Sequence, residues 1–276
     1  MNPLKGYHHL LRITDRYLSM NCVVFAGGRP GPDNPLYQYT QGKPKALLRI
    51  GDKTLLDYVV YALQEAQSIE EILVVGIDQG HELELRDPLH WISDQGSLYA
   101  NGMAAVDWIE KNWPNSGHTL FSTADIPALN GSVVDRFVTS CRPFDRSLYY
   151  CFVTQESLEA RYPGSRRTYV RLGDWRVAGG DMIVSRPELA KERRDLMDAL
   201  ISGRKHPWKI AQIVGLGTLV KLLLNRLDLS EVEQTASRVI GQPVKVMVSP
   251  DAELAMDVDK PHQFEILRDS LTSRSG

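Results

Sequence analysis

The first half of the chain alternates short apolar runs with segments of helical periodicity. The apolar runs expected to form strands cover residues 21–27, 70–77, 118–125 and 146–154. The intervening segments with apolar residues at helical spacing cover residues 54–66, 97–113 and 131–141. Such alternation is typical of α/β proteins, in which helices cover both faces of the sheet. We therefore predict a three-layer α/β/α fold with a mixed, mostly parallel, Rossmann-like sheet, and expect ligands at the carboxyl ends of its strands.

The second half has a different pattern. Residues 165–186 are predicted to form a hairpin that turns at Gly173-Asp174. Helical segments follow over about residues 187–242, several of them ended by glycine. A strand at 243–249 and a helix that begins near Pro261 complete the chain. We predict a single domain over residues 20–276 with a helical insertion at about 187–242, and a preceding N-terminal extension, residues 1–19, to which no role is assigned.

The overall composition excludes several classes of partner. The 32 basic residues are matched by 34 acidic ones and are spread along the chain, which argues against a nucleic-acid-binding surface. Apolar runs all fall short of the roughly 18 residues of a membrane span. The 3 cysteines have no metal-site spacing and are expected to remain reduced. These features predict a cytoplasmic protein with small-molecule partners, and they leave a homo-oligomer open.

The loop after the first strand is the first candidate site. Gly27 and Gly28 let the backbone approach a ligand, and exposed N–H groups in such a loop form a cradle for phosphate. Lys45, near the end of the same loop, would neutralise that phosphate as a point charge. Neither the P-loop motif nor the dinucleotide-binding glycine motif is present. Taken alone, the pattern also fits a surface loop with solvated lysines.

Aspartates supply the second and third candidates. Asp125 directly follows an apolar strand, so its carboxylate is expected at the edge of the sheet. Asp257 and Asp259 would point the same way in an extended segment, and like charges repel unless a cation lies between them. Carboxylates placed in this way suit Mg²⁺. The alternatives are a turn residue at Asp125 and a helix cap at Asp259.

The combination of these features resembles the GT-A-like nucleotidyltransferases. That group includes sugar-1-phosphate nucleotidylyltransferases and molybdenum-cofactor guanylyl- or cytidylyltransferases. The matching segments are residues 25–63, 94–106, 122–129, 177–181 and 256–264. The resemblance implies transfer of a nucleoside monophosphate from a nucleoside triphosphate (NTP) to a phosphorylated acceptor, with Mg²⁺ as cofactor and release of pyrophosphate.

The resemblance also implies residue roles. The nucleotide would be held by Ala26, Gly27, Gly28, Arg29, Lys45, Gly96, Ser97 and Asn101. Lys45 and Asp125 would act in catalysis, and the metal would be held by Asp125, Asp257 and Asp259. Gly179 and Gly180 would let the acceptor approach a strand.

Two arginines and one departure from the family pattern complete the set. Arg166 and Arg167 could grip an acceptor phosphate, since guanidinium groups match phosphate geometry, or could lie on a solvated hairpin edge. The family usually carries the motif G-x-G-x-R or G-x-S-x-R, and the arginine of that motif is missing here. Arg29 directly follows Gly28 and is therefore displaced from the usual position. The alternatives are a glycosyltransferase of the same fold, with Asp257-Val258-Asp259 as its metal motif, and a nucleotide-binding protein without turnover.

Overall fold

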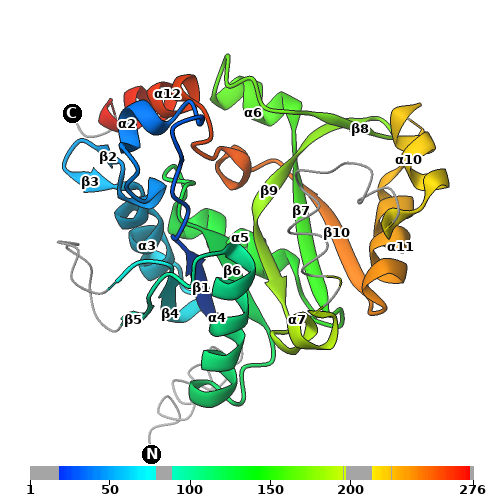
Figure 1. Ribbon diagram of the computed structural model, residues 1–276. Helices are drawn as coiled ribbons and strands as arrows, with labels where there is room; N and C mark the ends of the chain where they lie inside the picture. The colour runs from blue at the N-terminus through cyan, green and yellow to red at the C-terminus, as the bar shows by residue number, and fades with distance from the viewer. Residues whose placement is uncertain (1–18, 79–88, 195, 197–212, 225, 274–276) are drawn as a thin grey trace, which may run out of the picture.

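The computed structural model describes residues 19–78, 89–194, 196, 213–224 and 226–273 (Figure 1). Its strands are β1 (Met20–Phe25), β2 (Arg49–Ile50), β3 (Lys53–Thr54), β4 (Ile69–Val75), β5 (Leu89–Ile92), β6 (Thr119–Thr123), β7 (Leu148–Thr154), β8 (Val170–Leu172), β9 (Trp175–Ser185) and β10 (Val244–Ser249). Its α-helices are α2 (Tyr37–Thr40), α3 (Leu55–Glu65), α4 (Leu98–Asn112), α5 (Gly131–Ser140), α6 (Gln155–Arg161), α7 (Glu188–Glu192), α10 (Leu216–Leu223), α11 (Leu229–Ile240) and α12 (Pro261–Thr272). Two 3-10 turns, η1 (Lys45–Leu47) and η2 (Ala252–Ala255), complete the set for the described residues.

One large sheet organises the described part of the chain. Its strand order is β10-β7-β9-β6-β1-β4-β5, with β8 paired to β9. Strand β1 is parallel to β4 and β6, β4 is parallel to β5, and β10 is parallel to β7. Strand β9 is antiparallel to both β6 and β7, and β8 is antiparallel to β9. The predicted mixed, mostly parallel sheet is therefore confirmed.

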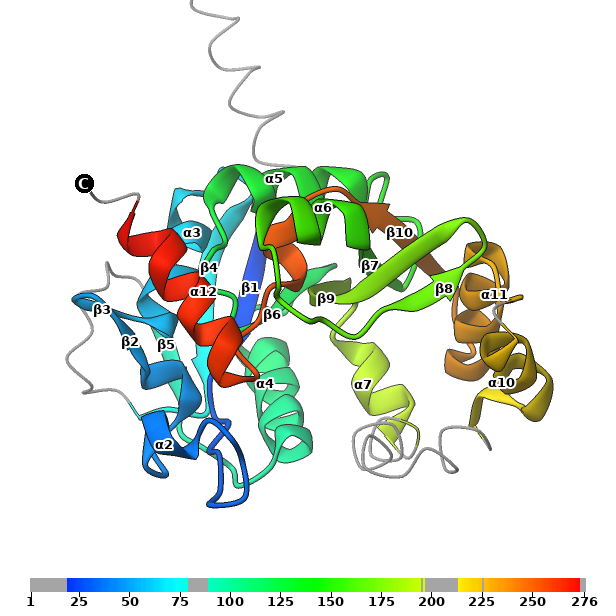
Figure 2. The same cartoon turned by 90° about the horizontal axis from the view of Figure 1, so that it is seen from above.

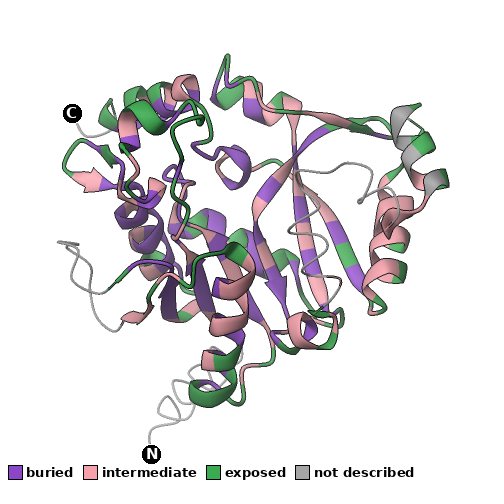
Figure 3. Ribbon diagram, in the orientation of Figure 1, coloured by how far each residue is buried: buried purple, intermediate pink, exposed green. Residues whose placement is uncertain are grey.

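Helices cover both faces of this sheet. The side chains of β1 alternate between the two faces, and each face buries its apolar side chains in a separate core. Cys22 and Val24 join the core that contains residues of α3 and α5, whereas Val23 joins a second core with residues of α4. Figure 2 shows α5 and α6 on one side of the sheet and α4 and α7 on the other. Figure 3 shows buried residues concentrated along the central strands between these layers.

Several predicted element boundaries follow from local capping. Helix α3 begins after Thr54, whose hydroxyl accepts a hydrogen bond from the Asp57 N–H at 3.1 Å while the Asp57 carboxylate accepts from the Thr54 N–H at 2.7 Å. Helix α11 ends at Gly241, which has a φ of 74°. The hairpin of β8 and β9 is also as predicted. The short elements α6 and β5 were not predicted from sequence.

The predicted division of the chain stays a prediction. Helices α7, α10 and α11 fall within the segment expected to form a helical insertion. Residues 197–212 of that segment, and residues 1–18 of the expected extension, lie outside the described residues. None of the described helices is both long enough and apolar enough to span a bilayer.

Candidate functional site

Three segments that are distant in sequence meet at the carboxyl edge of the sheet. The loop after β1 folds back so that the Lys45 N–H donates to the Gly28 carbonyl at 2.8 Å. Strand β6 lies beside β1 in parallel, which brings Asp125 to the same edge. The Asp125 carbonyl in turn accepts from the Val258 N–H at 2.9 Å and so anchors the segment that carries the remaining two aspartates. The structure thus brings Lys45 and the predicted metal-site carboxylates together.

Lys45 is held between two carboxylates. Its Nζ forms an ion pair with Asp125 Oδ2 and lies 2.8 Å from Asp259 Oδ1. Burial alone lowers the pKa of Lys45, but Asp125 and Asp259 outweigh that effect and raise the pKa above its ordinary value. Burial alone would raise the pKa of Asp259, but the nearby cations, Lys45 foremost, hold that pKa below its usual range. Lys45 therefore remains fully charged at the cavity wall.

The carboxylates form a site that suits a hard divalent cation. Oxygens of Asp125, Asp257 and Asp259 all lie within 4.8 Å of one another. Asp125 Oδ1 is buried and has no hydrogen-bond partner among the described residues. Carboxylate oxygens are the ligands that Mg²⁺ prefers, so the donor set fits this ion. Arg167, predicted to bind an acceptor phosphate, forms an ion pair with Asp257.

The glycine-loop cavity, defined by residues 25–29, 94–101 and the carboxylate cluster, lies beside these groups. Its volume is about 580 Å³, which is within the range of small-molecule sites. The predicted nucleotide-binding residues all line it: Ala26, Gly27, Gly28, Arg29, Lys45, Gly96, Ser97 and Asn101. The Arg29 Nε lies 3.8 Å from Asp94 Oδ2, and the Arg29 side chain is 55% exposed.

Helix α4 supplies the far wall of this cavity. The Ser97 hydroxyl caps the helix by accepting from the Ala100 N–H at 3.0 Å. The Asn101 side chain accepts from the Gln95 N–H at 2.7 Å and donates to Asp94 Oδ1 at 3.0 Å. Asn101 therefore fixes the turn before α4. Asp94, which lines the cavity, was not identified from sequence.

The two glycines after β1 serve different purposes. A Cβ on Gly27 would lie 3.0 Å from the Gly76 Cα, and one on Gly76 would lie 2.4 Å from the Gly27 backbone. Gly76 also has a φ of 101°. By contrast, no atom lies within 4 Å of a Cβ built on Gly28. Gly27 and Gly76 are therefore needed for backbone packing, whereas Gly28 leaves room at the cavity wall.

Alanine substitutions at Gly76 and Gly28 should separate these purposes. Gly76→Ala is expected to lower the free energy of unfolding by at least about 2 kcal/mol, because it combines backbone strain with a clash against Gly27. Gly28→Ala should change that free energy by less than about 0.5 kcal/mol. Because its methyl group would enter the cavity, it should still weaken nucleotide binding. Urea denaturation and calorimetric titration with each NTP measure the two effects; a large loss of stability in Gly28→Ala would contradict this division.

A hairpin cavity of about 430 Å³ adjoins the glycine-loop cavity. The predicted acceptor-site residues all line it: Arg166, Arg167, Gly179 and Gly180. A Cβ on Gly179 would lie 2.4 Å from the Tyr150 hydroxyl, and one on Gly180 would lie 2.6 Å from the Cys151 sulfur. Internal packing is therefore enough to explain both glycines.

Asp181 is a site residue that was not identified from sequence. It lies in β9 and lines both cavities. Burial, and then the neighbouring Asp125 carboxylate, raise the pKa of Asp181 to about 7. The signal in the sequence was its position directly after the glycine pair in a predicted strand, where strand alternation places it on the same face as Gly179.

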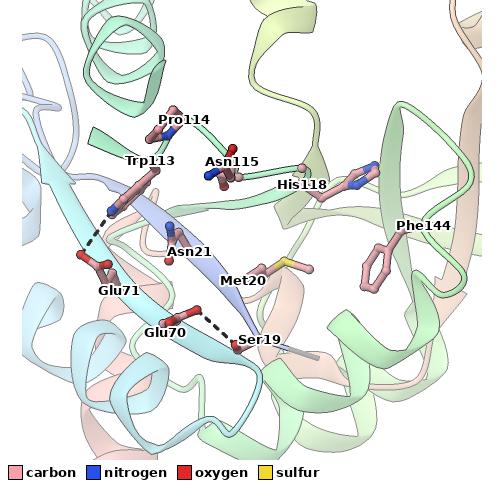
Figure 4. A pocket seen from close by; sticks show the side chains of 12 residues that line it. Ser19, Met20, Asn21, Glu70, Glu71, Trp113, Pro114, Asn115, His118 and Phe144 are labelled. Atoms are coloured by element: carbon pink, nitrogen blue, oxygen red, sulfur yellow. Dashed lines mark hydrogen bonds between the residues drawn. The ribbon is translucent and has the colours of Figure 1, made fainter. Parts of the chain in front are cut away.

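A further cavity of about 390 Å³ lies at the opposite ends of the strands (Figure 4). Its carboxylates are already paired. Glu71 Oε2 lies 2.7 Å from His90 Nε2 and accepts from the Trp113 indole at 3.2 Å, and Glu70 accepts from the Ser19 hydroxyl at 3.2 Å. We therefore place the functional site at the carboxyl edge.

Comparison with known proteins agrees with the resemblance to nucleotidyltransferases. Residues 22–242 match the family model of the MobA-like NTP transferase domain. A hypothetical transferase structure from Thermus thermophilus is 31% identical, with 89% of this chain and 99% of that chain covered and a TM-score of 0.76. No significant match was found among curated proteins.

More distant structures share the fold. A CMP:2-keto-3-deoxy-manno-octonic acid synthetase complexed with CTP is 12% identical, with 93% of this chain and 100% of that chain covered and a TM-score of 0.58. A 2-C-methyl-D-erythritol 4-phosphate cytidylyltransferase, also from Thermus thermophilus, is 15% identical, with 92% of this chain and 99% of that chain covered and a TM-score of 0.51.

Proposed function

The chain belongs to the MobA-like NTP transferase family and is a nucleotidyltransferase, and on that premise we propose that it transfers a nucleoside monophosphate to a phosphorylated small-molecule acceptor. The observation that carries the proposal is that Lys45 and Asp125 line the glycine-loop cavity, while Asp257 and Asp259, of the same carboxylate cluster, also line the adjoining hairpin cavity. The glycine-loop cavity would hold the NTP, and the hairpin cavity would hold the acceptor.

The proposed reaction needs positioning and charge neutralisation rather than a nucleophilic side chain. An oxygen of the acceptor phosphate attacks the α-phosphorus of the NTP, the bond from that phosphorus to the bridging oxygen breaks, and pyrophosphate leaves. Backbone N–H groups of Gly27 and Gly28 would bind phosphate oxygens, while the Lys45 ammonium neutralises charge that develops at the α-phosphate. Asp125, Asp257 and Asp259 would hold Mg²⁺, which when bound supplies further neutralisation of phosphate oxygens.

The direct test is a pyrophosphate-release assay. The purified protein is incubated with each NTP, Mg²⁺ and a panel of sugar, polyol and cofactor-precursor phosphates. CTP is the first nucleotide to test, since two of the structural neighbours are a synthetase in complex with CTP and a cytidylyltransferase. We expect acceptor-dependent pyrophosphate release that EDTA abolishes. The proposal would be contradicted if no acceptor gave pyrophosphate release and no NTP raised the unfolding temperature.

Binding of NTP without turnover is the second candidate function. Arg29 favours it, because this residue directly follows Gly28, away from the usual family position, and lies near Asp94. Thermal stabilisation by an NTP, with no pyrophosphate released from any acceptor, would identify this outcome. Hydrolysis of nucleotide sugars without pyrophosphate release would instead indicate glycosyl transfer.

A further inference from the structure

Two polar groups on the wall shared by the cavities have no protein partner. Thr123 and Asp181 line both the glycine-loop cavity and the hairpin cavity. Thr123 Oγ1 and Asp181 Oδ2 are buried, and neither has a hydrogen-bond partner among the described residues. Because burying an unpaired polar atom is unfavourable, a pair of such atoms facing a cavity indicates a ligand that completes their hydrogen bonds.

The sheet places these two groups side by side. In the antiparallel ladder of β6 and β9, Ser122 pairs with Met182, and Thr123 and Asp181 are the chain neighbours of this last pair. Both residues line the same two cavities. The two groups therefore present a hydroxyl and a carboxyl together to one ligand.

The neighbouring charges restrict the chemistry of that ligand. Lys45 is engaged by Asp125 and Asp259, and Arg167 is engaged by Asp257. Because these two cations are already paired with carboxylates, they favour a phosphate at this point less than unpaired cations would. A ligand hydroxyl fits, because it donates to the carboxylate and accepts from the threonine at the same time.

We propose that Thr123 and Asp181 are specificity-determining residues that recognise a hydroxyl group of the acceptor. The acceptor assignment rests on the proposed function, but recognition of a hydroxyl does not. The hairpin cavity supports the assignment, since Arg166 and Lys260 line it and offer charge for the phosphate of the same molecule.

Calorimetric binding of small phosphates tests this inference without requiring turnover. The probes are ribose 5-phosphate, glucose 1-phosphate and glycerol 3-phosphate, with methyl phosphate as the probe that lacks a hydroxyl. Wild-type protein is expected to bind at least one hydroxylated probe about tenfold or more tightly than methyl phosphate. Asp181→Ala and Thr123→Val should each remove most of that advantage and lower CTP affinity by a smaller factor. Asp174→Asn, in the exposed β8–β9 turn, is the matched control and should change neither quantity.

Several results would overturn the inference. One is equal binding of methyl phosphate and all hydroxylated probes, and another is the absence of measurable binding of any probe. A third is an unchanged preference for hydroxylated probes in Asp181→Ala. A loss of CTP affinity in both variants as large as the loss of that preference would assign the pair to the nucleotide instead. Asp181→Asn guards against misfolding: it should unfold at or above the wild-type temperature, and a clear fall would indicate a structural role. Failure of the pyrophosphate assay is a separate result, because these measurements concern binding alone.

Discussion

Replacing Lys45 by methionine is expected to lower kcat/KM for nucleotidyl transfer by about 10²–10³, which corresponds to roughly 3–4 kcal/mol of lost transition-state stabilisation. The reason is geometric, since the Lys45 ammonium is already fixed at the cavity wall by Asp125 and Asp259 and would need little reorganisation to face the α-phosphate. Steady-state pyrophosphate release measures this loss. Lys43→Met is the matched control, because Lys43 is exposed two residues away. A fall of less than about tenfold would exclude an electrostatic role for Lys45 in the transition state.

The same variant should be less stable in metal-free buffer. Removing Lys45 leaves Asp125 and Asp259 facing each other without their cation, although the 57% exposure of the Asp259 side chain limits the cost. We expect a loss of about 1–3 kcal/mol in the free energy of unfolding, with a lower Tm. Added Mg²⁺ should restore part of this loss by replacing the missing charge. Equal Tm values for Lys45→Met and Lys43→Met without metal would contradict this account.

Replacing Asp125 by asparagine should have a comparable effect on activity through the metal site. The substitution preserves the shape of the side chain and the backbone carbonyl that accepts from Val258. It removes the negative charge that pairs with Lys45 and that forms part of the carboxylate cluster. We expect kcat/KM to fall by about 10²–10³. Thermal stabilisation by Mg²⁺ with CTP should also fall sharply, because the remaining carboxylates bind the ion more weakly.

The Asp125 experiment needs a comparison that isolates charge at the site. Asp174→Asn makes the same chemical change in the exposed turn between β8 and β9 and should leave activity and metal-dependent stabilisation unchanged. Melting curves with and without Mg²⁺, taken at several CTP concentrations, provide the measurement. Full retention of metal-dependent stabilisation in Asp125→Asn would remove Asp125 from the proposed metal ligands.

The main elements of the site could be anticipated from sequence because they follow from local patterns. The apolar run at 21–27 and the one that ends at Asp125 were both expected to be strands, and they are parallel neighbours in the sheet. Residues that follow parallel neighbours reach the same edge, so the approach of Lys45 to Asp125 needed only a loop that folds back. The roles given to these residues stay predictions.

Contacts between distant segments could not be read in the same way. The ion pair between Arg167 and Asp257 was not predicted, since it depends on where the hairpin of β8 and β9 lies relative to the end of the chain. The close approach of Gly27 to Asn101 and Gly76 was not predicted either. Neither distance is encoded in the spacing of residues along one segment.

The alternation of strand and helix patterns, read in the sequence alone, determined an α/β fold with a mostly parallel sheet, and it predicted a site at one edge of that sheet. This was sufficient because side-chain periodicity specifies which face of an element is buried. Only the tertiary structure decided that Thr123 and Asp181 face the same cavities without partners. The reason is that the antiparallel register of β6 and β9, and the burial of both groups, arise from the packing of the whole sheet rather than from either strand.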